Sequence, residues 1–223
     1  MTPANRNAEK YLQQVCSLGL RWQEVMPTIM DTLHHIVPSY GNCFFAANQQ
    51  GDVVDIFDER PEAQSVTALY AEHFLNRKEK EVFIGWRNAG AFRSAVDFDR
   101  LLKVDRRQFM RHELYNEVLK PIGYYYGAHV VLRVGSELRG YLQVERGRKS
   151  GRYTAAELRR LDRAGAFIQY ALGPAPVVDD DPLYSPDVNQ QGMIVADRAG
   201  RIQHVSKTAR QLLHLSCFSR VSE

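Results

Sequence analysis

The chain has few of the residues that would place it among disulfide-stabilised, metal-binding or membrane proteins. Its 223 residues include three cysteines, Cys16, Cys43 and Cys217. They are odd in number and far apart, which argues against a disulfide framework or a Cys-x-x-Cys metal site and favours buried free thiols. No apolar run approaches the ~20 residues of a membrane span, and the first residues lack the apolar core of a signal peptide. We therefore expect a cytoplasmic protein without membrane contact.

Motifs for catalysis are also missing. The sequence contains no glycine-rich phosphate loop and no recognisable nucleophile, base and acid set. The nearest candidate for a catalytic carboxylate pair, Asp97 and Asp99, lies in a loop segment without periodicity. An enzyme is therefore not expected, and neither a metal nor a cofactor is predicted. The net charge of +3 is too mild to indicate nucleic-acid binding by itself.

The most informative stretch runs from residue 111 to residue 172. It predicts a helix that follows an N-cap at Asp105 and ends before Pro121, then a β-hairpin, then a second helix. Residues 128–134 and 138–144 alternate with period two about a turn at residues 135–137. If Val134 pairs with Leu138, all the apolar positions lie on one face.

The opposite face of this hairpin is mixed in character. The same register places Val131 opposite Tyr141 and His129 opposite Gln143. The sheet is therefore expected to have one dry face and one partly polar face.

The next helix can cover the dry face. Thr154 and Glu157 fit a capping box, and apolar residues then recur at helical spacing. More apolar surface is present than one sheet face needs, so a partner helix is expected, either the chain's own N-terminal helix or one from another subunit. The residues assigned to a dimer interface on this reasoning are Leu161, Ala164, Phe167, Ile168 and Ala171.

The remaining segments are read more coarsely. Helices are predicted over residues 8–20, 22–37 and 62–77, and strands over 42–48 and 53–57. The charged run 77–81 is interpreted as a solvated helix end. Residues 82–104 carry large aromatic side chains without periodicity, so this segment either packs over something or closes on something.

The order of elements resembles that of a GAF domain. One motif is more specific, because Tyr-x-Glu-x-Leu-x-Pro-x-Gly before the last hairpin is similar to the GAF-like sensory region of bacterial LuxR-type helix-turn-helix regulators. The resemblance implies an α+β fold with a central antiparallel sheet. An N-/C-terminal helix pair would cover one face, and loops and helices would enclose a pocket on the other. The motif residues here are Tyr115, Glu117, Leu119, Pro121 and Gly123.

The resemblance also implies a domain organisation. Residues 1–172 would form the GAF-like sensory domain, and the Pro/Asp-rich residues 173–191 a linker. Residues 192–223 are similar to the opening hairpin and helix of a PAS-like module. The family's helix-turn-helix is missing, so the sequence is expected to be a fragment cut inside that second module.

Other GAF functions are disfavoured by specific departures. Cys43 is followed by Phe44, whereas the pocket cysteine of bilin-binding GAF domains is commonly followed by histidine. The signature of cyclic-nucleotide GAF domains is absent. The three cysteines are too dispersed for a GAF-type methionine-sulfoxide reductase.

In such a fold the mixed sheet face looks into the pocket. We therefore predict a ligand site with the composition of a small-molecule pocket, apolar with a few polar groups. The alternative is that the same residues fill a collapsed pocket or lie half exposed. The predicted floor is His129, Val131, Tyr141 and Gln143, and the predicted walls are Trp86, Phe92, His112 and Tyr115.

Three hypotheses of function follow. The first is a regulatory domain that binds an unknown small-molecule effector, assembles as a homodimer and reaches DNA only through helices missing here. The second is a ligand-free dimerisation platform of the same regulator, whose terminal helices pair across a two-fold axis. The third is thiol catalysis, which requires a reactive cysteine of low pKa.

Overall fold

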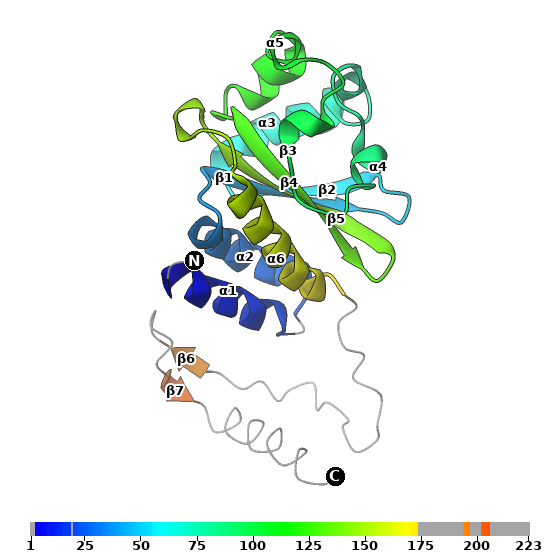
Figure 1. Cartoon of the computed structure of the whole chain (residues 1–223). Helices are drawn as coiled ribbons and strands as arrows, with labels where there is room; N and C mark the ends of the chain where they lie inside the picture. The colour runs from blue at the N-terminus through cyan, green and yellow to red at the C-terminus, as the bar shows by residue number, and fades with distance from the viewer. Residues whose placement is uncertain (1–2, 19, 174–193, 197–201, 206–223) are drawn as a thin grey trace. The chain divides into compact units, whose positions relative to one another are not determined.

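The computed structural model describes residues 3–18, 20–173, 194–196 and 202–205. The chain divides into two compact units, Met1–Pro176 and Val177–Glu223. The first unit has the expected α+β fold, in which a five-stranded antiparallel sheet separates a layer of long helices from a layer of short ones (Figure 1).

The sheet has the strand order β2-β1-β5-β4-β3, with every neighbouring pair antiparallel. Its first hairpin consists of β1 (Gly41–Ala47) and β2 (Val53–Asp58), close to the strands expected from the sequence. The long central strands are β4 (Tyr126–Val134) and β5 (Glu137–Arg146), and β3 (Val96–Asp97) is a short edge.

The predicted mixed face of the β4–β5 hairpin is confirmed. Val131 pairs with Tyr141, and His129 pairs with Gln143. The register at the turn was predicted incorrectly, because Val134 pairs with Glu137 rather than Leu138. The pairing skips one residue of β5 beyond Leu132, and this bulge turns Leu138 onto the same face as Tyr141.

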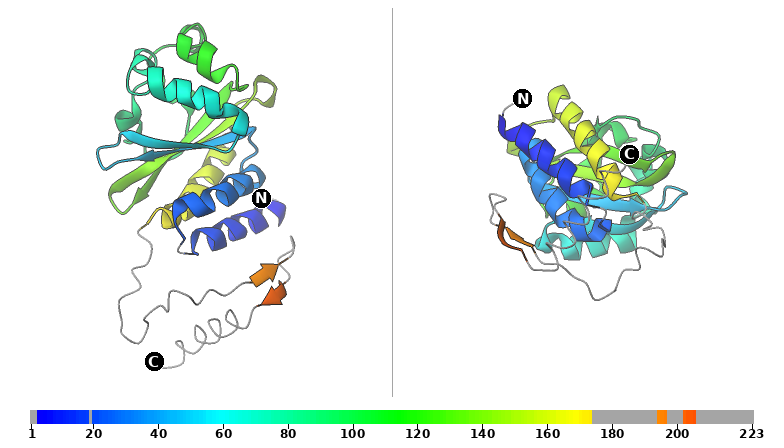
Figure 2. Two further views of the ribbon diagram at one scale, coloured as in Figure 1. Left: turned by 180° about the vertical axis from the view of Figure 1, so that it is seen from behind. Right: turned by 90° about the horizontal axis from the view of Figure 1, so that it is seen from below.

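Two long helices, α2 (Trp22–Ile36) and α6 (Ala155–Ala171), lie against the dry face, and α1 (Pro3–Cys16) packs on them on the side away from the sheet (Figures 1 and 2). Thr154 caps α6 in the predicted capping box with Glu157. Helix α6 approaches β4 closely at Gly165, where a Cβ atom would lie 3.2 Å from Val130 Cγ2. The buried side chains of these helices and the dry face form one apolar core.

The residues assigned to a dimer interface belong to this core. Helix α1 packs against both α2 and α6, so the chain's own N-terminal helix covers the second side of α6. Within this chain, four of the side chains are buried and Phe167 is half-buried against the same cluster, and their role in a dimer interface remains a prediction. The five are Leu161, Ala164, Phe167, Ile168 and Ala171.

Short helical segments cover the mixed face. The predicted helix 62–77 is divided into η1 (Pro61–Ala63), α3 (Gln64–Leu69) and the π-helical turn η2 (Tyr70–Phe74). After them come η3 (Lys78–Glu81), α4 (Trp86–Ala89) and η4 (Phe98–Leu101). The helix predicted before Pro121 is also broken, into α5 (Arg106–Phe109), which Asp105 caps as expected, and the π-helical η5 (Leu114–Leu119). A last turn, η6 (Arg148–Ser150), precedes α6.

Gly140 lies where β5 is flanked by both neighbouring strands. A Cβ atom there would lie 2.5 Å from the Phe45 carbonyl oxygen and 2.6 Å from Phe44 Cε2. We expect Gly140→Ala to lower the free energy of unfolding by about 1–3 kcal/mol, the usual cost of overpacking. Urea denaturation measures this loss. Gly147→Ala is the control, because its Cβ would meet only the Gly123 carbonyl oxygen at an ordinary 3.6 Å; equal losses in both variants would contradict the prediction.

In the second unit, β6 (Ile194–Ala196) and β7 (Ile202–Val205) form the predicted hairpin. The helix expected after Ser206 and most of the predicted linker lie outside the described residues. The division into a sensory domain 1–172, a linker 173–191 and a PAS-like piece 192–223 remains a prediction.

Candidate functional site

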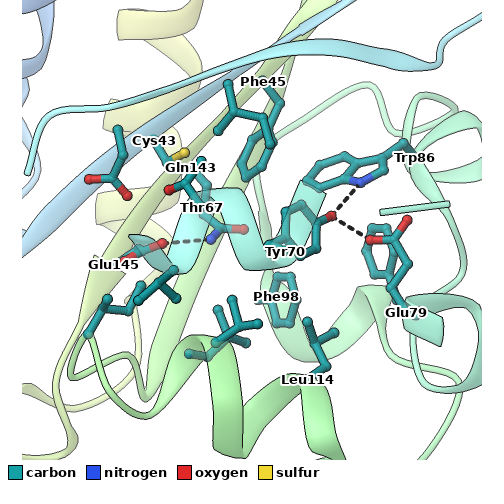
Figure 3. A pocket seen from close by; sticks show the side chains of 17 residues that line it. Cys43, Phe45, Thr67, Tyr70, Glu79, Trp86, Phe98, Leu114, Gln143 and Glu145 are labelled. Atoms are coloured by element: carbon teal, nitrogen blue, oxygen red, sulfur yellow. Dashed lines mark hydrogen bonds between the residues drawn. The ribbon is translucent and has the colours of Figure 1, made fainter. Parts of the chain in front are cut away.

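A cavity lies between the mixed face of the sheet and the short helices. Its volume is about 70 Å³, and its walls are largely aromatic and aliphatic side chains (Figure 3). Ligand pockets usually enclose about 300–1,000 Å³, so in this conformation side chains occupy most of the space that a ligand would need. The lining residues are Cys43, Phe45, Ile56, Asp58, Val66, Thr67, Tyr70, Glu79, Phe83, Trp86, Phe98, Leu114, Val118, Leu119, Ile122, Gln143 and Glu145.

One polar cluster lies on the helical side of the cavity. The Tyr70 hydroxyl donates a hydrogen bond to the Glu79 carboxylate, and Trp86 Nε1 donates to the Tyr70 oxygen at 2.9 Å (Figure 3). Burial raises the pKa of Glu79, and hydrogen bonds from Tyr70 and Asn76 only partly offset this effect. Burial also raises the pKa of Tyr70 well above its ordinary value, so its hydroxyl remains protonated and can act as a donor.

The local backbone explains why Glu79 turns inward. Asn76 adopts a φ of 58°, which folds the chain back between η2 and η3. The Asn76 N–H then donates to Glu79 Oε1 at 2.8 Å. The interpretation of residues 77–81 as wholly solvated is therefore wrong at one position, since Glu79 is 1% exposed while its four charged neighbours are exposed. Periodicity gave no signal for this inward turn, because it depends on a single left-handed residue.

A second polar cluster lies over the sheet. Gln143 Nε2 donates to Glu145 Oε1 at 2.8 Å, and Arg60 Nη2 donates to Glu145 Oε2 at 2.7 Å. Arg60 also binds Asp58 through Nε and Nη2 at 3.0 and 2.8 Å. Burial raises the pKa of Glu145, and the neighbouring Arg60 partly offsets the effect. One guanidinium thus serves two buried carboxylates at the wall of the cavity.

Of the eight residues predicted for the site, Trp86 and Gln143 line the cavity. Tyr141 lies beneath Trp86 with the ring centroids 4.9 Å apart, and its hydroxyl donates to the Trp86 carbonyl at 2.7 Å. Truncating Tyr141 would therefore damage the core rather than report on binding. His129 and Val131 are buried beside it in the same layer.

The other predicted walls also lie outside the cavity lining. Tyr115 is buried against Phe109, with ring centroids 5.6 Å apart. His112 Nε2 is paired with Glu81 at 3.1 Å, and Phe92 is half-buried at the edge of the second apolar cluster. Whether any of the eight residues contacts a ligand remains a prediction.

The thiols show no sign of activation. Burial raises the pKa of Cys16 to about 12, and it raises the pKa of Cys43, in the cavity wall, well above the ordinary value. Because the thiolate is the nucleophile, neither cysteine is suited to catalysis at neutral pH. Cys217 lies outside the described residues. Within those residues, no group of histidine, cysteine, aspartate and glutamate side chains is placed to hold a metal, and no helix is long and apolar enough to cross a membrane.

Comparison with solved structures identifies the fold. The chain is similar to the ligand-binding domain of VqsR from Pseudomonas aeruginosa, with a TM-score of 0.51 and 12% identity over 77% of this chain and 98% of that one. It is equally similar to CepR2 from Burkholderia cenocepacia, an N-acylhomoserine lactone dependent LuxR family transcription factor, with a TM-score of 0.51 and 13% identity over 75% and 92% of the two chains.

A GAF domain gives a comparable match. The GAF domain of the cyanobacteriochrome TePixJ aligns with a TM-score of 0.50 and 14% identity over 71% of this chain and 92% of that one. No family model and no curated protein matches the sequence. At such low identities the likeness establishes a shared fold, the GAF-like fold of LuxR-type ligand-binding domains.

Proposed function

We propose that residues 1–172 form the sensory domain of a cytoplasmic, LuxR-type bacterial transcription regulator, and that they bind a small-molecule effector in the cavity over the mixed sheet face. The observation that carries the proposal is the buried cluster of Tyr70, Glu79 and Trp86 beside a cavity with largely aromatic and aliphatic walls. Glu79 offers an acceptor for a ligand N–H or O–H, and a ligand carbonyl would replace Glu79 or Tyr70 as the acceptor of the Tyr70 O–H or the Trp86 N–H. DNA contacts would be made by helices outside this chain.

Signal transfer would follow the central strands. Gln143 and Glu145 of β5 line the cavity, while Leu142 and Val144, which alternate with them, face the core beneath α6. An effector that favours one arrangement of these strands would increase the population of molecules in which α6 and the segment that follows it adopt the matching arrangement. A homodimer is also part of the proposal.

N-acylhomoserine lactones are the first class to test, because CepR2 depends on them and because they combine an amide N–H, carbonyls and an apolar chain. We expect saturable binding in isothermal titration calorimetry. Glu79→Gln and Tyr70→Phe should each weaken it about 10- to 100-fold, which corresponds to one lost hydrogen bond to a charged or buried partner.

The matched control is Glu113→Gln. That carboxylate is exposed and paired with Lys78 on the outside of the domain, so the variant should bind as the unaltered protein does. Native mass spectrometry of the purified protein extends the test to effectors of other classes. If no molecule is retained, and no lactone binds saturably, the proposal is refuted.

A further inference from the structure

His129 is a buried polar residue without a hydrogen-bond partner. Its side chain is 0% exposed at the centre of β4, and neither Nδ1 nor Nε2 has a partner among the described residues. Buried polar groups are nearly always hydrogen-bonded, because leaving them unsatisfied costs folding free energy. An apolar residue would fill this position at a lower cost in folding free energy. Packing alone therefore does not explain why a histidine is buried here.

Trp86 separates this imidazole from the cavity. The indole lies 5.6 Å from the His129 ring, centroid to centroid, and it also forms part of the cavity wall. The Tyr141 ring is stacked on the imidazole at 5.5 Å with an interplanar angle of 26°, and it also lies 4.9 Å from the indole, so the three rings contact one another. Gln143, the cross-strand partner of His129, also lines the cavity, but its amide nitrogen donates to Glu145.

The backbone of Trp86 is anchored by contacts that do not involve its indole. The Trp86 carbonyl accepts hydrogen bonds from the Tyr141 hydroxyl at 2.7 Å and from the Gly90 N–H at 2.9 Å. The indole donates one hydrogen bond, to Tyr70, and its ring also packs against Phe45 and Phe83 at 4.4 and 5.1 Å. A rotation of the side chain could therefore join the space it fills to the cavity while helix α4 remains in place.

We infer that the ligand site extends beneath the Trp86 indole to His129, and that a neutral, planar ligand ring bearing a hydrogen-bonding atom occupies this inner compartment when the indole swings aside. The inference rests on the proposed function and specifies the ligand class. A planar ring would take the place of the indole against Tyr141, and its polar atom would pair with the imidazole. Burial lowers the pKa of His129 to about 3, so the imidazole is neutral and offers one donor and one acceptor.

Two probes of the same shape test the inference. Benzimidazole carries a ring donor and a ring acceptor, whereas indene carries neither. Trp86→Phe should open the compartment and bind benzimidazole at least tenfold more tightly than the unaltered protein. The imidazole ¹⁵N resonances of His129 should shift in the same titration. Trp22→Phe is the control, because Trp22 packs against Phe44 in the core on the opposite sheet face and should leave the affinity unchanged.

Adding His129→Leu to Trp86→Phe should remove the gain for benzimidazole and leave indene binding unaltered. The melting temperature of His129→Leu should not fall, since an unsatisfied polar group is replaced by an apolar one, so lost binding would not reflect unfolding. The inference is overturned if Trp86→Phe brings no gain or if His129→Leu does not abolish it. The proposed function is judged separately, by effector binding and its dependence on Glu79.

Discussion

Arg60→Ala is expected to lower the free energy of unfolding by about 3–5 kcal/mol, the usual cost of removing one partner from a buried ion pair. Arg60 is 6% exposed, and its guanidinium is the shared partner of Asp58 and Glu145 at 2.8 and 2.7 Å. These carboxylates hold the pKa of Arg60 above its ordinary value despite burial, which favours the neutral form. Without the cation, two buried carboxylates repel each other beside the cavity.

Chemical denaturation of the two proteins measures this loss. Arg87→Ala is the matched control, because Arg87 makes a similar two-point contact with Asp52 at the surface, where solvent screens the pair and little change is expected. The triple variant with Asp58→Asn and Glu145→Gln should recover much of the stability, since the unpaired charges are removed. If Arg60→Ala lowered the free energy of unfolding no more than Arg87→Ala does, the ion pairs of Arg60 would not have the energetic weight expected of buried pairs.

The second large effect is a loss of stability in acid that depends on Glu157. Burial alone would raise the pKa of this carboxyl, but hydrogen bonds from Arg146 and Thr154 outweigh burial and lower it to about 2. Arg146 Nη2 lies 2.5 Å from Glu157 Oε1, and the two side chains are 7% and 13% exposed. Because the folded pKa is below the unfolded value of 4.5, the stabilisation is present above about pH 4.5 and is lost as the pH falls toward 2.

A shift of this size corresponds to roughly 3 kcal/mol at neutral pH. Glu157→Gln can still act as a capping-box residue but cannot form the ion pair, so it should be less stable than the unaltered protein at pH 7. The difference should shrink as both proteins are unfolded in urea at successively lower pH, and it should nearly vanish near pH 2. A difference that stays constant with pH would show that the charge of Glu157 is not what stabilises α6.

Elements set by local chemistry were predictable from the sequence. The caps at Asp105 and Thr154 were recognised because one side chain satisfies nearby backbone N–H groups, and each is present. The two faces of the β4–β5 hairpin followed from period-two alternation over most of its length. Alternation failed only past Leu132, where the bulge reverses the side on which Leu138 lies.

The candidate site was predicted less well because it depends on non-local packing. Tyr70 falls within the predicted helix 62–77 and Glu79 within the charged run 77–81, yet the two side chains meet beside the cavity with Trp86. No spacing in the sequence relates these three residues, since they come from a π-helical turn, a 3-10 turn and a short helix.

By itself, the sequence determined the layers of this protein: a sheet with unequal faces, a capped helix for the dry face and aromatic side chains for the other. Those features follow from periodicity and capping, which act over a few residues. Only the tertiary structure decided that α1 packs on α6, and that Trp86 lies against His129. These outcomes depend on which apolar surfaces, distant in the sequence, pack against each other and exclude water. A pattern of a few consecutive residues does not specify the packing partner.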